Sequence, residues 1–559
     1  MSVRSRKPAA TQPELDDQNQ QSPTHVTSSA EVAAQLPADK TNKEPPPEKP
    51  ADARRRTYVI LSFWALILSL GLPIWWHTTS VYRASLPLDE MMDWADGRAC
   101  RPTFPLTIAI EKGTMRQDET DVLIQMTQMV LDNLSDSPDS TDRQLRLTVA
   151  NETAIDDERI ALTVRLNPGD TTTTALQPEQ PILQVTYAAN TLPSPGLASR
   201  IAKDIHAVFS EEQAVISALV AEASGSTKPS LSGVSPAVAA AVAKRSTRSL
   251  KYAPTYHLTF SLFTAGASPS SWDIDVAVEQ YMRPVLDVLS PVHNFTIDTQ
   301  VQLYAAPGVQ SDVLSKEDLS SFINAAEWPL SPSIGGAPTI NFVVFVGNQS
   351  ISLPTSEAGS DATATARSWL IPQWGTVYLV PHTAETANKV PVQSLRTPMA
   401  TFTAHLLSLL GTPETSGSLP LRLAGLRRIR SADLVLRASS SLGSLARLSR
   451  ALPGIAIPRS VAEGVSTTLK HLRQACDALG TSAGLAHARI AQVAADKAFF
   501  EKSMVGQLYF PDEHKIAVYL PLLGPVGVPL VMGLLNELKA WRKRRQEKAA
   551  AGKTGKKTE

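Results

Sequence analysis

Two long runs of uncharged residues lie near the ends of the chain and separate a mixed central sequence from two polar tails. The first run extends from Thr57 to Trp76 and the second from Ile516 to Leu535, and each contains 20 residues. A helix of that length crosses the hydrocarbon core of a bilayer. The pattern therefore predicts two transmembrane helices, at residues 57–78 and 516–537.

The first run reads as an anchor that stays in the protein. A cleavable signal has a shorter apolar core close to the N-terminus and a small-residue cleavage site, whereas this run begins more than fifty residues into the chain and is followed by YRASLP. Trp75 and Trp76 stand where an aromatic belt would meet the membrane surface. A buried core helix is a weaker interpretation, because such a helix rarely runs this long without a polar face.

The second run is interrupted by prolines and glycines at residues 521, 524, 525, 527 and 529. Membrane-spanning helices tolerate such residues when neighbouring helices satisfy the freed backbone groups, and small residues allow close helix approach. We therefore expect this helix to lie within a multi-helix assembly.

Basic residues flank the outer ends of both runs. Arg54 to Arg56 precede the first, Arg542 to Arg545 follow the second, and residues 539–559 contain nine basic and two acidic side chains. Positive flanks favour the cytosolic side. The expected topology has two cytosolic tails, at residues 1–53 and 538–559, and one large lumenal segment between the spans. The first tail has the composition of a disordered segment.

Short β-branched runs bounded by turn residues predict strands in the central segment. There are eight of them: TFPLTIAIEK, LRLTVA, ALTVRL, PILQVTYA, YHLTFSLF, FTIDTQVQLYA, TINFVVFV and WGTVYLVP. Apolar residues at helical spacing predict helices over 118–134, 197–222 and 272–289. From Thr401 onward the pattern is almost entirely helical.

The predicted fold class is therefore a mixed α/β lumenal domain with a helical C-terminal part, flanked by two transmembrane helices. The expected boundaries are 84–400 for the α/β core and 401–510 for the helical segment packed on it. Stretches rich in Ser, Ala and Gly at 223–250 and 350–367 are expected to be mobile loops. The sequence shows no internal repeat.

Composition adds little about partners but something about compartment. The 559 residues contain 53 basic and 53 acidic side chains, so no global charge favours nucleic acid.

The two cysteines, Cys100 and Cys476, could pair or stay free. Four N-x-S/T sequons, candidates for glycosylation, lie between the predicted spans, at Asn133, Asn151, Asn294 and Asn348. The terminal KKTE resembles a dilysine retrieval signal formed by Lys556 and Lys557, although a solvated basic tail is an equal reading.

Two motifs approach the form of a nucleophile site. GTSAG places Ser482 in the G-x-S-x-G pattern of a nucleophile elbow, which needs a strand before it and a helix after it. Both flanks of Ser482 read as helix, so a helix–helix turn is the better interpretation. QACDA places Cys476 in a sequence similar to the caspase signature, but the two following positions differ. A core cysteine is the better interpretation there.

The ten histidines are scattered, with no H-E-x-x-H and no cluster at metal-ligand spacing. His382, after the last predicted strand, is most simply a loop residue. The sequence contains neither of the phosphate-binding glycine motifs, G-x-x-x-x-G-K-[ST] and G-x-G-x-x-G. We expect no metal, no cofactor and no catalytic residue in this chain.

Several segments together resemble one protein family. PIWWHTTSVYRASLP (73–87), residues 256–305, NFVVFV (341–346), WGTVYLV (374–380) and residues 508–535 are similar to the PIG-S family, a subunit of the GPI transamidase. The similar segments occur in the family's order, from the first predicted anchor through the second.

The resemblance implies a place in a complex of the endoplasmic-reticulum membrane. That complex cleaves the C-terminal signal of a precursor protein and joins the new end to the amine of a glycosylphosphatidylinositol (GPI). Its catalytic cysteine and histidine belong to a caspase-like subunit, and other subunits are multi-spanning. The resemblance thus implies a non-catalytic supporting subunit, whose contact with substrate or lipid stays open.

Two other functions remain in view from the sequence. One is a membrane-tethered lumenal hydrolase or transferase that acts through Ser482 or Cys476. The other is a cargo receptor retrieved by its terminal lysines. The first would lose activity when these two side chains are removed, and the second would purify with vesicle coats.

Overall fold

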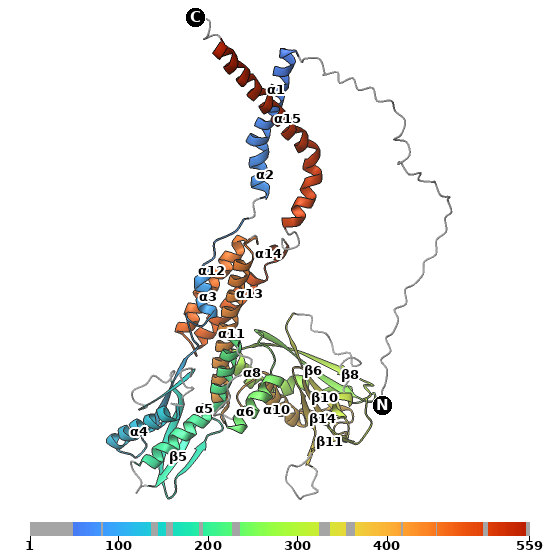
Figure 1. Cartoon of the computed structure of the whole chain (residues 1–559). Coiled ribbons are helices and arrows are strands. Elements are labelled where there is room, and N and C mark those ends of the chain that lie inside the picture. The colour runs from blue at the N-terminus through green and yellow to red at the C-terminus, as the bar shows by residue number, and fades with distance from the viewer. Residues whose placement is uncertain are drawn as a thin grey trace, which may run out of the picture. The chain divides into compact units, whose positions relative to one another are not determined.

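The computed structural model describes most of the chain between Lys49 and Thr554. The described residues are 49–79, 82–135, 144–151, 160–188, 194–225, 235–322, 336–353, 364–414, 417–453, 455–506 and 512–554. The chain divides into two compact units (Figure 1). Among the described residues, those up to Thr79 and from Ala517 onward form the membrane unit, and those between them form the globular unit.

The membrane unit is built from the two apolar runs. The first run lies in α1 (Pro50–Leu66), a π-helical turn η1 (Ile67–Gly71) and α2 (Leu72–Thr79). The second lies in α15 (Asp512–Thr554), which continues through its three prolines. Segments long and apolar enough to cross a bilayer extend over Ala51–His77 and Ala517–Gln546, both without burial inside the protein. Both predicted helices are therefore present.

The globular unit contains two five-stranded sheets. The first has the strand order β2-β1-β3-β5-β4 and the second the order β8-β6-β10-β14-β13. The strands of the first sheet are β1 (Phe104–Glu111), β2 (Leu145–Asn151), β3 (Ile160–Gly169), β4 (Thr173–Leu176) and β5 (Ile182–Ala188). Those of the second are β6 (Thr255–Thr264), β8 (Asn294–Gln302), β10 (Thr339–Val346), β13 (Ser368–Ile371) and β14 (Gly375–Val380).

The two sheets have the same topology. In each sheet, the strand that comes first in sequence is an interior strand. The next strand pairs with it in parallel on one side, and two further parallel strands lie on the other side. The far edge of each sheet is an antiparallel strand that precedes the last parallel strand in sequence, β4 before β5 and β13 before β14. The globular unit therefore contains a structural repeat, although the sequence shows no internal repeat.

The connecting helices repeat as well. Between the first two strands lies α4 (Gln117–Ser135) in one repeat, and α7 (Ile274–Ala277), η6 (Val278–Met282) and α8 (Arg283–Leu289) in the other. After the last strand comes α5 (Pro195–Ala223) or α10 (Val392–Leu409). All eight predicted strands and the three predicted helices are confirmed.

The second sheet is covered on both faces, which explains its unbroken apolar sequence. Along β10, Phe342 and Val344 pack into the core shared with the helices, whereas Val343 and Phe345 pack into a separate cluster with Phe322. Successive side chains of a strand point to opposite faces. Parallel strands buried on both faces accordingly lack the polar alternation of a half-exposed strand.

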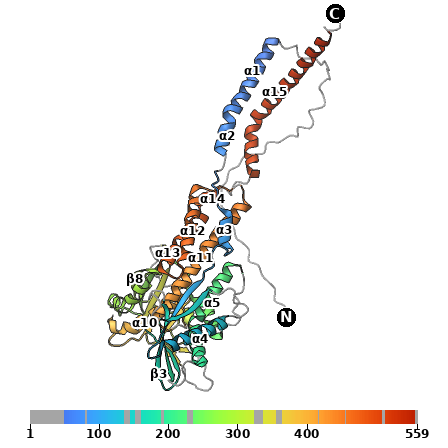
Figure 2. The same cartoon turned by 90° about the vertical axis from the view of Figure 1, so that its left-hand side faces the viewer.

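A long helix joins the two repeats. α11 (Leu419–Ala451) contributes Leu421 and Ile429 to the core of the first sheet, and Leu434 and Leu442 to the core of the second. α12 (Arg459–Asp477) and α13 (Ser482–Phe499) pack on α11 (Figure 2). The predicted fold class, an α/β part followed by a helical C-terminal part between two apolar helices, is confirmed.

The smaller elements complete the unit. They are α3 (Leu88–Ala95), α6 (Pro236–Arg248), α9 (Leu319–Phe322), α14 (Lys502–Gly506), and the short strands β7 (Ser271–Trp272), β9 (Val313–Leu314), β11 (Ser350–Leu353), β12 (Ala364–Ala366) and β15 (Lys389–Val390). α6 lies inside the stretch 223–250 that was expected to be a loop. Ser235 caps its first turn, accepting a hydrogen bond from Val238 N, and Pro236 suits the first helical position.

Candidate functional site

Ser482 lies in a turn between two helices. It is the first residue of α13, α12 ends at Asp477, and Thr481 caps α13 by accepting a hydrogen bond from Gly484 N at 3.0 Å. Gly480 has a φ of 86°, and a Cβ on Gly484 would lie 2.1 Å from the carbonyl oxygen of Ala478. The turn thus explains both glycines, and the strand that a nucleophile elbow needs is replaced by α12.

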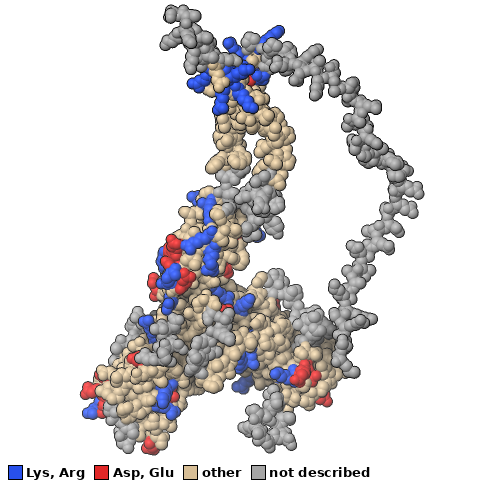
Figure 3. All heavy atoms as spheres, viewed as in Figure 1, with Lys and Arg blue, Asp and Glu red and all other residues tan. Residues whose placement is uncertain are grey.

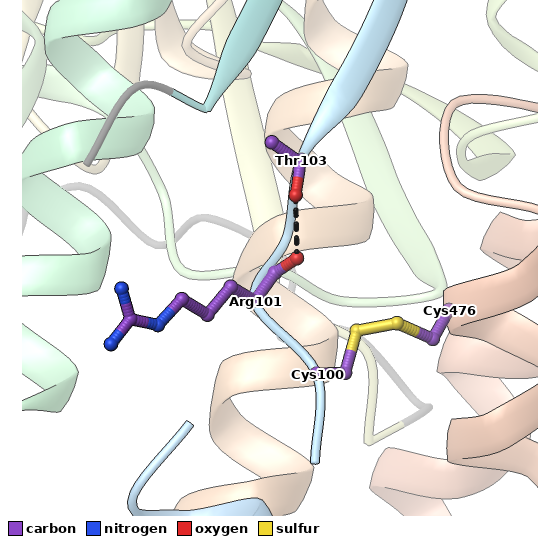
Figure 4. The surroundings of a disulfide bond; sticks show 4 residues. All are labelled: Cys100, Arg101, Thr103 and Cys476. Atoms are coloured by element: carbon purple, nitrogen blue, oxygen red, sulfur yellow. Dashed lines mark hydrogen bonds between the residues drawn. A yellow bond between two sulfur atoms is a disulfide. The ribbon is translucent and has the colours of Figure 1, made fainter. Parts of the chain in front are cut away.

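Cys476 is bonded to Cys100 in a disulfide (Figure 4). The Cα atoms are 6.5 Å apart, and 376 positions of the sequence separate the two residues. Cys100 lies just before β1 and Cys476 near the end of α12, so the bond ties the first repeat to the helical part. Since a thiolate is the nucleophile in cysteine catalysis, a disulfide-bonded Cys476 cannot act as one.

The histidines form no metal cluster in the described residues, where no group of three His, Cys, Asp or Glu side chains could hold an ion. His382 follows β14, and its backbone N–H donates to Asn348 Oδ1 at 3.0 Å. His471 and His487 lie on α12 and α13 with their Nδ1 atoms 3.0 Å apart. Burial and the neighbouring His487 lower the pKa of His471.

A cavity of about 640 Å³ lies beside the disulfide. Its walls come from the end of α3, residues 100–103, the end of α5 and the middle of α11, and its charged groups are Arg101, Arg146, Arg447 and Asp96. Figure 4 shows the Arg101 guanidinium pointing away from the disulfide, and Thr103 Oγ1 donates to the Arg101 carbonyl at 3.0 Å. The walls carry cationic and hydroxyl groups but no nucleophile with a neighbouring base.

A buried ion pair fastens α5 to α11. Arg428 donates two hydrogen bonds to Glu212, from Nε at 2.6 Å and from Nη2 at 2.8 Å, and both side chains are 5% exposed. Glu211, the preceding residue, accepts from the backbone N–H of Glu414 at 2.9 Å. A two-point Arg–carboxylate contact fixes orientation as well as distance. This pair holds the first repeat in register with the helix that joins the repeats.

The two apolar helices contact each other in antiparallel register. Arg56 Nε and Thr57 Oγ1 both donate to the Glu537 carboxylate at 2.9 Å, and Trp64 Nε1 lies 3.4 Å from the carbonyl oxygen of Leu530. A Cβ on Gly533 would lie 3.3 Å from Ile60 Cδ1. We call the surface of α15 formed by Leu530, Gly533 and Glu537 its α1 side.

Basic side chains gather at one end of this helix pair (Figure 3). The sequence places Arg54, Arg55 and Arg56 at the start of α1, and Lys539, Arg542, Lys543, Arg544 and Arg545 in the C-terminal part of α15, just after Glu537. The contact between Arg56 and Glu537 places the two basic segments side by side. The structure thus brings together two charge clusters that are almost five hundred residues apart in sequence.

Three of the four sequon asparagines are exposed. Asn133 lies in the last turns of α4, Asn294 begins β8 and Asn348 follows β10, whereas Asn151, at the end of β2, is half-buried. A glycan attached to Nδ2 of Asn348 would leave Oδ1 free to accept its bond from His382. Lys556 and Lys557 lie outside the described residues.

The sequence analysis did not find the residues that connect these elements. Glu537 had a signal, because it is an acidic residue at the end of an apolar run with Arg56 at the matching end of the other run. Glu212 and Arg428 had none, since their spacing of 216 residues carries no local pattern.

Comparisons with known proteins find relatives that match most of the chain. Residues 62–544 match the model of the PIG-S family, described as phosphatidylinositol-glycan biosynthesis class S protein. The chain is 26% identical over 539 residues to the human GPI-anchor transamidase component PIGS, covering 86% of this chain and 96% of that protein.

Two yeast proteins are similar over comparable lengths. The GPI transamidase component PIG-S homolog of Schizosaccharomyces pombe is 27% identical over 512 residues, covering 88% of this chain and 85% of that protein. The GPI transamidase component GPI17 of Saccharomyces cerevisiae is 24% identical over 529 residues, covering 88% of this chain and 93% of that protein.

Proposed function

Because the chain belongs to the PIG-S family, we propose that it is a non-catalytic subunit of a GPI transamidase complex. Such a complex attaches preassembled GPI anchors to the carboxyl end of precursor proteins in the endoplasmic reticulum. The observation that carries the proposal is the continuous family match, which begins inside the first apolar helix and ends in the basic segment after the second.

The proposed topology is a hairpin with both tails in the cytosol and the globular unit in the lumen. The antiparallel pairing of α1 with α15 and the shared basic end support it, because basic flanks favour the cytosolic side. The Cys100–Cys476 disulfide supports a lumenal globular unit, since such bonds persist in oxidising compartments. The proposed lumenal parts are residues 84–400 and 401–510, and the proposed tails are 1–53 and 538–559.

A supporting role fits the geometry better than catalysis. Cys476 is in a disulfide and Ser482 is in a helix–helix turn, so the enzyme alternative has neither of its nucleophiles in a reactive setting. The catalytic cysteine is proposed to lie on a separate caspase-like subunit. The cargo-receptor alternative has no supporting observation.

The chemistry of transamidation gives such a subunit a task. The acyl–enzyme must meet a lipid-linked amine before it meets water, which is a problem of positioning and of water exclusion. A globular unit joined to two anchors can keep a catalytic chain at the membrane. The α11 helix, which enters both sheet cores, holds the two repeats of that unit together.

The test is removal of the gene from its own cell, followed by an assay of precursor cleavage and anchor attachment. We expect both to fail, and we expect the wild-type chain and a Ser482→Ala variant to restore both. Normal anchor attachment without the gene would refute the proposed function. Failure of Ser482→Ala alone, with the complex assembled, would favour the enzyme alternative.

We also propose roles for the sequon asparagines and for the two lysines near the C-terminus. Asn133, Asn294 and Asn348 are proposed to carry glycans, because each is exposed within a sequon; Asn151 is a weaker candidate. Lys556 and Lys557 are proposed to act as a cytosolic retrieval signal. Endoglycosidase treatment before and after Asn→Gln substitution measures the first proposal, and steady-state location after substitution of both lysines by serine measures the second.

A further inference from the structure

Three prolines are spaced four residues apart inside α15. Proline has no backbone N–H, so Pro521, Pro525 and Pro529 each remove one i to i−4 hydrogen bond from the helix. The carbonyl oxygens that lose these partners are those of Ala517, Pro521 and Pro525. Because residues four apart lie above one another on a helix, the three freed carbonyls form a single row. We call this surface of α15 the proline side.

The side chains of this segment offer the row almost no donor. Between Ala517 and Leu535, Tyr519 is the only residue whose side chain has a hydrogen-bond donor. Carbonyl oxygens left without a donor in hydrocarbon are costly, and lipid chains carry no donors. A water-filled path would need polar walls, but Leu520, Leu522 and Val528 are exposed and apolar.

The helix α1 contacts a face of α15 other than the proline side. At about 100° per residue, the proline side and the α1 side lie roughly 130–150° apart around the helix. Three donors of α1 are also used on the α1 side, since Arg56 and Thr57 donate to Glu537 and the Trp64 indole faces Leu530. The freed carbonyls therefore lie on a different face of α15 from the contacts that α1 makes.

The backbone is open where the row of carbonyls lies. A Cβ built on Gly524 has nothing within 4 Å, whereas a Cβ on Gly533 meets Ile60 at 3.3 Å. Gly524 is about 60° from the centre of the proline side. A small residue at that place allows another helix to approach the backbone closely.

We propose that the proline side of α15 docks a membrane-spanning helix of a partner subunit that presents hydrogen-bond donor side chains, such as Ser, Thr, Asn or Gln, to the freed carbonyls. This inference rests on the proposed function, because it requires the chain to be part of a membrane complex. It adds which face of which helix forms the contact, and the chemistry that its partner supplies.

Photo-crosslinking in native membranes of the full-length chain tests the location of the contact. A photoreactive residue replaces Val528 or Met532, both about 20° from the centre of the proline side, or Val526, which faces the α1 side. The three positions are matched in exposure, at 62%, 53% and 61%. We expect Val528 and Met532 to yield one adduct with a different, membrane-spanning protein, and Val526 to yield none. Equal adducts at all three positions, no protein adduct, or an adduct with a second copy of this chain would overturn the proposal.

Restoring an N–H tests the chemistry. Pro525→Leu returns a donor to the Pro521 carbonyl and removes the need for a partner's donor. We expect the adduct at Val528 to fall about fivefold, the effect of one interhelical hydrogen bond, whereas Val526→Leu leaves it unchanged. An unchanged adduct in Pro525→Leu would overturn the donor chemistry. Co-purification of the wild-type chain with other transamidase subunits is measured in parallel, so that failure of the proposed function is seen separately.

Discussion

His293 shows how the core fixes the protonation of a single side chain. It is fully buried between α8 and β8, and its Nδ1 atom lies 2.8 Å from the carbonyl oxygen of Ala253, which accepts the hydrogen bond. Burial, followed by the positive charge of Arg430, lowers the pKa of His293 to about 3. The imidazole is therefore neutral in the folded protein at every physiological pH.

This lowered pKa makes stability depend on pH. In the unfolded chain the histidine binds a proton near pH 6.5, whereas the folded chain excludes the proton until about pH 3. Stability is therefore complete above pH 6.5 and is lost as pH falls below it. We expect the free energy of unfolding to fall by up to about 1.4 kcal/mol per pH unit through this group. Thermal unfolding at pH 7, 6 and 5 measures it, and His293→Asn should flatten the slope; equal slopes would contradict the assignment.

The Arg428–Glu212 pair is the second prediction at this scale. Arg428→Met leaves the Glu212 carboxylate buried without its partner, which costs about 3–5 kcal/mol. Arg200→Ala breaks a pair with Asp204 whose arginine is 56% exposed, and is expected to cost at most about 0.5 kcal/mol. Chemical denaturation of the purified variants compares them. Similar losses in both would show that the buried pair does not lock α5 to α11.

At the scale of elements, local pattern was sufficient for strands and helices with strong periodicity. The strand β10, with its unbroken apolar residues, and the amphipathic α4 were both visible because burial acts on neighbouring residues. Short edge strands such as β4 carry no comparable signal, and α6 was hidden by an alanine- and serine-rich composition. The structural repeat could not be seen in the sequence. A topology fixes only the order and direction of the strands, and different side chains can build the same topology.

The disulfide belongs to the same scale, because it joins the segment before β1 to α12. Spacing could not predict it, since 376 positions separate the cysteines. A Cys100→Ser/Cys476→Ser double variant removes the bond that restricts the unfolded chain, so that packing alone holds the two segments together. We expect this variant to lose about 2–5 kcal/mol of stability. Its melting temperature is compared with that of the wild-type chain, and mobility on non-reducing gels reports the bond. A wild-type chain with two titratable thiols would contradict the assignment.

At the scale of the whole molecule, two repeated α/β layers and one joining helix form one compact unit, and two apolar helices form the other. Protease added to sealed microsomes tests its placement. We expect the two tails to be digested and residues 84–510 to be protected until detergent opens the vesicle. Digestion of the globular unit in sealed vesicles, with the tails spared, would reverse the proposed topology.

The central claim is that this chain works as a supporting part of an anchor-attaching complex. Purification of the tagged full-length chain in mild detergent, with identification of every chain that co-purifies, tests it most directly. The account predicts a stable assembly that contains a caspase-like protein and multi-spanning proteins, and that retains anchor-attaching activity with Ser482→Ala. A chain that purifies alone, or with vesicle coats and cargo, would contradict it.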